Sequence, residues 1–290
     1  LPASDAFATQ LLRQAGAVIL GKVVTTEIAM MTPGKTRNPH DLERTPGGSS
    51  SGSCAAVGDN MAPLALGSQT AGSTLRPASF CGIYGYKPTF GSISCTGVSP
   101  ISRKLDHVGP LARSLEDLAI LGDTLMVYDP RDEEMRASPF MDLETSLSRP
   151  LSGAPRIGFA RTHAWGEGDP DAFLTFENFV ASLGDSVDEF ELPDSFAELP
   201  GHHDNVMSAG LAYFYAEEVT RTPALMQQMT IDRIAAGLSV TAAEYLRSLD
   251  QVARIRAEVH EAMRGYDALI VPPATGEAPV GLKTTGSPVF

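Results

Sequence analysis

Two glycine-flanked serine clusters are the part of this chain best suited to chemistry. A serine hydroxyl can act as a nucleophile or pass a proton, and glycine lets backbone N–H groups approach a ligand closely. Two such loops joined by an apolar segment favour acyl chemistry done by hydroxyls and backbone amides, without a metal. The clusters are Gly47-Gly48-Ser49-Ser50-Ser51-Gly52-Ser53 and Gly67-Ser68-Gln69-Thr70-Ala71-Gly72-Ser73.

The elements that must position these clusters can be expected from local sequence. Small residues predict a short helix over 53–60, and the apolar run 63–67 predicts a buried strand that leads into the second cluster. Residues 31–53 are rich in Pro, Gly, Thr and Ser, which indicates a loop, and 85–88 is a turn region. Before them we expect a helix over 4–14 and a buried strand over 17–20.

The second half of the chain alternates helical and strand patterns. A strand over 156–160, a helix over 171–183 and a strand over 186–192 form a β–α–β unit, which favours a parallel sheet. We therefore predict an α/β fold with a mixed, largely parallel central sheet covered by helices on both faces. Further elements are expected from Ser114 (helix), over 203–220 (helix), over 241–264 (helix opened by a Thr241/Glu244 capping box) and over 267–271 (strand).

Composition limits the classes of partner. The 290 residues carry a net charge of −13, which argues against nucleic acid or an anionic membrane surface. Residues 1–110 hold nine Lys/Arg and six Asp/Glu, so the acidity lies in the remainder, with 13 and 29. No segment is long and apolar enough to span a bilayer. Three cysteines without CxxC spacing favour a reduced, cytoplasmic protein.

Three other motifs are weaker. The G-x-S-x-G match around Ser50 would need a strand directly before it, and 38–46 is not strand material. The run His202-His203-Asp204 points in different directions along a helix start, so we expect surface residues and no metal site. Cys81 is expected to be a small buried residue, because nothing around it marks an activated thiol.

The chain resembles the amidase signature family of serine hydrolases. The resemblance is close over about 21–132, so we expect one amidase-type domain over 1–290, with a signature core at about 17–132 and a helical and α/β remainder over 133–290. The motifs that carry it are Gly21-Lys22, Asn38-Pro39, Pro46-Gly47-Gly48-Ser49-Ser50, Pro63-Leu64-Ala65-Leu66-Gly67, Ala71-Gly72-Ser73, Phe80-Cys81-Gly82, Lys87-Pro88-Thr89 and Leu105-Asp106-His107-Val108-Gly109-Pro110.

The resemblance implies a Ser–Ser–Lys triad and no cofactor. Ser73 would be the nucleophile, and Ser49, following a non-proline cis peptide bond, would relay its proton. The backbone N–H groups of Thr70, Ala71, Gly72 and Ser73 would form the oxyanion hole. Gln69 stands where the family usually has a carboxylate, and with Ser50 it is a candidate for contact with substrate. Arg76 lies one place later than in the commonest form of the motif.

The lysine of that triad has no match in this chain. In the family it lies several tens of residues before the bridging serine, and counting back from Ser49 runs off the start. Lys22, Lys35, Lys87 and Lys104 do not lie in the matching context. We therefore expect a fragment, incomplete at both ends and poorly active alone.

The sequence supports an amidase acting on a small-molecule amide. Two alternatives stay open: the glutaminase subunit of a tRNA-dependent amidotransferase, and a non-catalytic binding or scaffold member of the fold. The oligomeric state is also open, with a homodimer as one option.

Overall fold

The computed structural model describes residues 3–137 and 142–289. Its strands form two separate three-stranded sheets. The helices are α1 (Phe7–Gln14), α2 (Ser51–Gly58), α3 (Leu75–Phe80), α4 (Leu115–Leu125), α5 (Leu143–Ser148), α6 (Pro170–Ser182), α7 (Leu199–Arg221), α8 (Gln228–Leu238) and α9 (Ala242–Ala262). The strands are β1 (Leu64–Gln69), β2 (Tyr84–Gly85), β3 (His107–Ala112), β4 (Ile157–Ala160), β5 (Val187–Phe190) and β6 (Ala268–Ile270).

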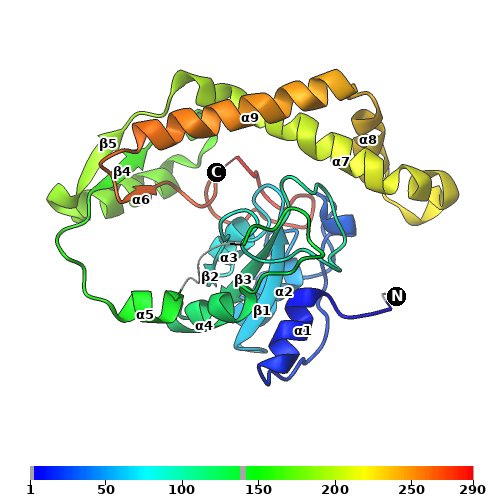
Figure 1. Cartoon of the computed structure of the whole chain (residues 1–290), viewed down its shortest axis with the longest axis horizontal. Coiled ribbons are helices and arrows are strands. Elements are labelled where there is room, and N and C mark those ends of the chain that lie inside the picture. Colours follow the sequence, from blue (N-terminus) through cyan, green and yellow to red (C-terminus); the bar gives the residue numbers. More distant parts are fainter. Residues whose placement is uncertain (1–2, 138–141, 290) are drawn as a thin grey trace.

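The first sheet carries the serine clusters. Its order is β1-β3-β2, and both pairs are antiparallel, with Gly67 opposite Gly109 in the register. Helix α2 starts within the first cluster, and β1 ends at Gln69 inside the second. The sheet therefore brings both clusters to one region of the molecule (Figure 1).

The second sheet is parallel, with the order β5-β4-β6. Helix α6 connects β4 to β5, which confirms the β–α–β unit expected from the sequence. The ring centroids of Trp165 and Phe176 lie 5.6 and 6.1 Å from that of Phe159. The ring centroid of Phe173 lies 4.4 Å from that of Trp165. Burial of these aromatic rings holds α6 on the sheet.

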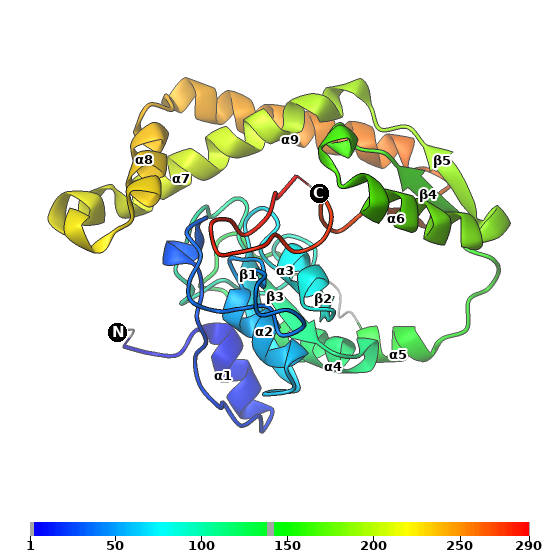
Figure 2. The ribbon, with the colours of Figure 1, turned by 180° about the vertical axis from the view of Figure 1, so that it is seen from behind.

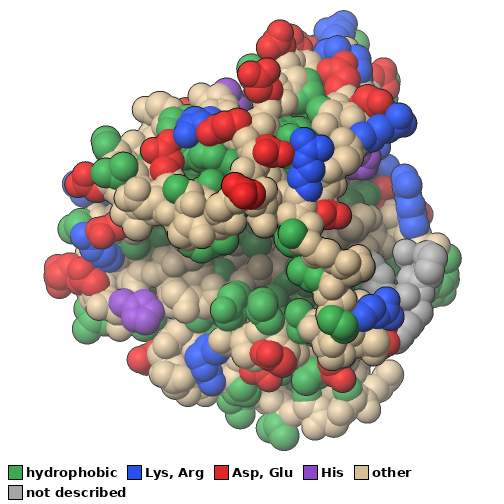
Figure 3. Space-filling view, turned by 90° about the vertical axis from the view of Figure 1, so that its left-hand side faces the viewer, with side chains coloured by type: hydrophobic (Ala, Val, Ile, Leu, Met, Phe, Trp, Pro, Cys, Tyr) green, Lys and Arg blue, Asp and Glu red, His purple; other side chains and the backbone are tan. Residues whose placement is uncertain are grey.

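Helices α7, α8 and α9 form an arch above the first sheet, and the second sheet lies at one end of it (Figures 1 and 2). Residues 272–289 return from β6 into the space between the arch and the first sheet. Seen from the side of the second sheet, the surface is hollowed between an upper and a lower mass, with hydrophobic side chains at the rim (Figure 3).

The α/β class is confirmed, with one refinement and one correction. The described strands form two sheets, and parallel pairing is confined to the second. The buried strand expected over 17–20 is wrong, because that segment has no strand partner and leaves Val18 83% and Leu20 72% exposed. An apolar run becomes a strand only where a neighbouring strand satisfies its backbone groups.

Candidate active site

Hydrogen bonds join the two serine clusters directly. The hydroxyl of Ser50 donates to the carbonyl of Ser68 at 3.2 Å and accepts from its N–H at 3.1 Å. The N–H of Ser50 donates to the carbonyl of Ser73 at 3.3 Å. Ser50 is only 6% exposed, and its side chain thus holds the two loops together.

Ser49 lies in a tightly held backbone segment. It is 2% exposed, and the Gly48–Ser49 peptide bond is cis, as the family resemblance implies. Its carbonyl accepts from the N–H of Thr26 at 3.2 Å and from the hydroxyl of Thr25 at 2.9 Å. The carbonyl of Gly48 accepts from Nη2 of Arg76 at 2.7 Å. The peptides on both sides of Ser49 therefore have fixed directions.

The loop that ends at Ser73 leaves consecutive N–H groups without a partner. Within residues 3–137 and 142–289, the N–H groups of Ala71, Gly72 and Ser73 have no acceptor, whereas Oε1 of Gln69 accepts from the next two, those of 74 and 75, at 2.9 and 3.0 Å. The Gln69 side chain thereby caps the first turn of α3. A run of free amides in a tight bend is suited to hold an anionic oxygen.

Arg76 ties this loop to a distant part of the chain. It is 5% exposed, and its Nε donates to the carbonyl of Thr285 at 2.9 Å. Burial lowers the pKa of Arg76 to about 10, so the guanidinium stays charged at neutral pH. A Cβ on Gly72 would lie 2.8 Å from Nη1, so a larger residue at this position would have to displace the end of the guanidinium.

The half-buried Lys87 lies beside His107, which is paired with Gln69 in the register of β1 and β3. Nζ of Lys87 donates to the carbonyl of Pro88 at 2.9 Å and lies 3.4 Å from Nε2 of His107, and burial lowers the pKa of Lys87. Lys104 pairs with Glu134 at 2.8 Å. No lysine in the described part of the chain forms a hydrogen bond with Ser49 or Ser73.

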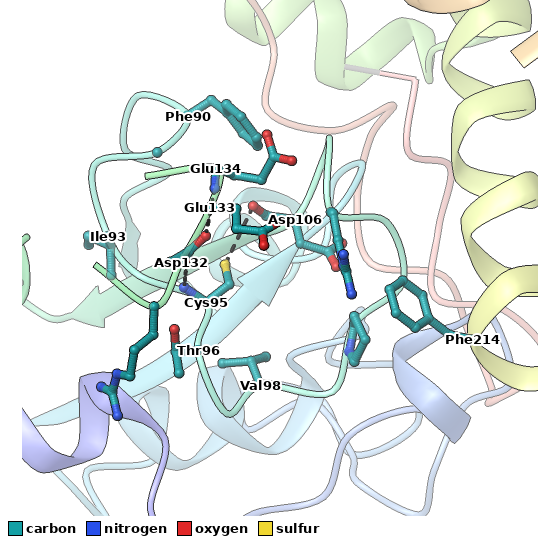
Figure 4. Close-up of a pocket in the computed structure, with 14 residues that line it drawn as sticks. Phe90, Ile93, Cys95, Thr96, Val98, Asp106, Asp132, Glu133, Glu134 and Phe214 are labelled. Atoms are coloured by element: carbon teal, nitrogen blue, oxygen red, sulfur yellow. Dashed lines mark hydrogen bonds between the residues drawn. The ribbon is translucent and has the colours of Figure 1, made fainter. Parts of the chain in front are cut away.

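A cavity of about 310 Å³ has Asp106 in its wall, and none of its described lining residues belongs to either serine cluster (Figure 4). Oδ1 of Asp106 accepts from the hydroxyl of Thr70 at 2.5 Å, and burial raises the pKa of this carboxyl. Phe90 and Phe214 contribute apolar surface, and the guanidinium of Arg103 lies over the Phe214 ring, 5.7 Å from its centroid. The volume is in the range of small-molecule sites.

The cysteines are not set up as nucleophiles. Cys54 and Cys81 are fully buried, as expected for Cys81, and Cys95 lies in the cavity wall, where its Sγ faces the carbonyl of Asp106 at 3.6 Å. Burial raises the pKa of both Cys81 and Cys95 to about 12. The thiols are therefore neutral at physiological pH.

His202, His203 and Asp204, near the start of α7, point in different directions, as the sequence indicates. Nδ1 of His202 lies 3.3 Å from the hydroxyl of Ser248, Asp204 pairs with Arg233, and Nε2 of His203 lies 2.9 Å from the carbonyl of Thr70. The contact of His203 with the serine loop could not be foreseen from local pattern. Among the described residues, no group of three or more His, Cys, Asp or Glu could hold a metal. No described helix is long and apolar enough to cross a bilayer.

Comparison with known proteins identifies the family of this chain. The Amidase family model matches residues 1–287. A glutamyl-tRNA(Gln) amidotransferase chain of Roseiflexus castenholzii, the one designated A, is 34% identical over 93% of this chain and 61% of its own length. The AtzE chain of the 1-carboxybiuret hydrolase of Pseudomonas sp. is 35% identical over 95% of this chain and 61% of its own length.

Solved structures of similar fold include two of related interest. A complex described as vestigial, and as revealing the origins of an s-triazine catabolic enzyme, superposes with a TM-score of 0.87 at 34% identity, over 96% of this chain and 61% of that chain. The 6-aminohexanoate cyclic dimer hydrolase, complexed with substrate, superposes with a TM-score of 0.83 at 27% identity, over 95% and 61%.

The chain therefore belongs to the amidase family, which includes amide hydrolases. It spans about three fifths of the length of the relatives it matches.

Proposed function

We propose that this chain forms most of the active site of an amidase that works through an acyl-serine intermediate. Ser73 Oγ attacks the amide carbonyl, its proton passes to Ser49 and on to a base, and a C–O bond forms. The C–N bond then breaks as the leaving nitrogen takes up a proton, and ammonia or an amine departs. Water attacks the acyl-Ser73 ester, and the carboxylic acid is released.

One observation carries this proposal. The N–H groups of Ala71, Gly72 and Ser73 have no acceptor among the described residues and end at the proposed nucleophile, while the neighbouring amides at 74 and 75 are capped by Gln69. Donors with fixed directions stabilise the oxyanion of a tetrahedral intermediate, and each is worth about 3–4 kcal/mol of the activation barrier.

The proposed mechanism also needs a general base. A serine hydroxyl is a weak nucleophile without a general base, and the family resemblance implies that this base is a neutral lysine. No lysine in the described part of the chain forms a hydrogen bond with either serine, and the matched relatives are longer than this chain. We therefore expect residues 1–290 alone to turn over amides slowly, and the full-length gene product is the protein to test.

The test combines a panel of amide substrates with a fluorophosphonate probe. We expect labelling at Ser73 and hydrolysis of at least one amide, with both abolished by Ser73→Ala, a loss of at least about 10⁴-fold. Ser79→Ala, at an exposed serine of the same region, is the matched control and should keep wild-type activity. Full activity in Ser73→Ala would contradict the assignment.

A second candidate is the glutaminase component of a tRNA-dependent amidotransferase, because matched relatives are amidotransferase chains. Ammonia release from glutamine only in the presence of partner chains would favour it. A lack of both labelling and turnover in the wild-type protein would favour the non-catalytic alternative.

A further inference from the structure

We infer that His203 positions the oxyanion loop of the proposed amidase by holding the carbonyl of Thr70. The inference rests on the proposed function, and it assigns a role in catalysis to a residue 133 positions away in the sequence. Nε2 of His203, in the first turns of α7, lies 2.9 Å from that carbonyl oxygen. A carbonyl oxygen can only accept, so Nε2 carries the hydrogen.

The hydrogen bond from His203 sets the direction of the Thr70–Ala71 peptide group. The Thr70–Ala71 bond is trans, since the cis bond among the described residues is Gly48–Ser49. In a planar trans peptide, the carbonyl of one residue and the N–H of the next point in opposite directions. By fixing the carbonyl of Thr70, His203 therefore aims the N–H of Ala71 to the other side, where it has no acceptor among the described residues.

Three further hydrogen bonds, all to Asp106, help to hold Thr70 in place. The hydroxyl of Thr70 donates to Oδ1 of Asp106 at 2.5 Å, and Oδ2 of Asp106 accepts from the N–H groups of Ile101 and Ser102 at 2.8 and 2.9 Å. Asp106 is thus fixed by its own loop and holds the side chain of Thr70, while His203 holds its backbone. Rotation of the Thr70–Ala71 peptide requires the loss of the imidazole hydrogen bond.

The imidazole itself does not enter the chemistry in this proposal. It would act through the Ala71 N–H, which has no acceptor among the described residues and is free to donate to the oxyanion. Loss of His203 should therefore reduce transition-state stabilisation more than substrate binding. Misdirecting one donor should cost about 10- to 100-fold in kcat, less than the roughly 10²- to 10³-fold lost when a donor is removed.

The test uses three variants of the full-length protein. His203→Leu should lower kcat about 10- to 100-fold with KM changed less than about threefold, and should slow fluorophosphonate labelling of Ser73 by a similar factor. His203→Gln, whose amide nitrogen can donate from a similar position, should recover most of the loss. His202→Leu is the matched control: its imidazole faces Ser248 on α9, and the variant should behave as wild type.

A structural readout separates failure of this inference from failure of the proposed function. Amide hydrogen exchange in the peptide covering 67–73 should be faster in His203→Leu than in wild type, and unchanged in His202→Leu, whether or not the protein is active. Wild-type kcat, labelling and exchange in His203→Leu would overturn the inference. An inactive, unlabelled wild type would overturn the proposed function. Hydrogen exchange would then still show whether His203 holds the carbonyl of Thr70.

Discussion

Around the first sheet many buried side chains are polar, whereas around the second they are mostly aromatic and aliphatic. Of the seventeen buried polar or charged residues in the described chain, twelve lie within residues 1–110. At the second sheet, Phe159 is 3% exposed and contacts the rings of Trp165 and Phe176. The first region depends on hydrogen bonds with fixed directions, and the second depends on the volume that its side chains fill.

This contrast follows from what each region has to do. A buried polar group costs free energy unless it is paired, so the geometry of a region with many of them depends on its hydrogen bonds. A packed aromatic cluster tolerates small movements but not loss of volume. Substitutions in the first region should therefore alter activity, and those in the second should alter stability alone.

The largest effect on stability is expected from Phe159→Ala. Removing a buried ring from the aromatic cluster should lower the free energy of unfolding by about 3–5 kcal/mol. Phe179→Ala, at a ring that is 51% exposed on the adjacent helix, should cost less than half as much. Denaturant titration measures both. A kcat changed by more than about threefold in the folded Phe159→Ala variant would break the comparison.

Next is Arg76→Met, which should affect both stability and activity. It leaves the buried carbonyls of Gly48 and Thr285 without a donor, which should cost about 2–4 kcal/mol by denaturant titration. Because Gly48 precedes Ser49, we also expect kcat to fall by more than about 10-fold.

Arg113→Met is the matched control for that variant. Arg113 also donates to two carbonyls, those of Val57 and Ala62, but it is exposed, so the effect should stay below about 1 kcal/mol. Equal losses in the two arginine variants would contradict a special role for burial at Arg76.

The dependence of stability on pH should also distinguish the regions. Burial, helped by the charge of Lys87, lowers the pKa of His107 to about 4, against about 6.5 in the unfolded chain. Below pH 6.5 the unfolded state therefore binds more protons, and stability should fall as the pH decreases from 6.5 to 4.

The variant His107→Asn should flatten that part of the profile. Its amide can still donate to the carbonyl of Leu105, as Nδ1 of His107 does at 2.6 Å. His260→Asn, at an exposed position on α9, should retain the wild-type slope. Unfolding midpoints measured between about pH 4 and 7.5 test this, and an unchanged slope in His107→Asn would refute it.

The smallest effect is expected at the start of α9. Thr241 accepts from the N–H of Glu244 at 3.2 Å, and Oε2 of Glu244 accepts from the N–H of Thr241 at 2.8 Å. Thr241→Ala should cost about 1 kcal/mol and leave kcat unchanged. Thr220→Ala, within an exposed turn of α7, should stay within about 0.5 kcal/mol. A change in kcat on loss of this cap would show that the arch is coupled to the first region.

The sequence predicts best what depends on neighbouring residues. The Thr241/Glu244 capping box and the β–α–β unit are confirmed, because caps and alternating elements have local signals. Strand β3 is not foreseen, since 107–112 becomes a strand only through pairing with β1 and β2. The exposed Val18 shows the opposite case, an apolar run with no strand partner.

The same distinction holds at the candidate site. The family motifs indicate Ser49, Ser73 and the amides between 70 and 73, and the roles given to them stay predictions. The contacts that hold those groups come from far away in the sequence, from His203 and Thr285, and no spacing rule connects them to the serine loops.

The bond between Arg76 and Thr285 also bears on how the protein is made. The two residues are 209 positions apart, so a ribosome adding about 5–20 residues per second makes Thr285 roughly 10–40 s after Arg76. During that interval the guanidinium and the backbone before Ser49 lack a neighbour that later covers them. The loops that carry the proposed nucleophile are thus synthesised early and completed late, and a nascent chain halted before Thr285 should hold them in an open, protease-sensitive form.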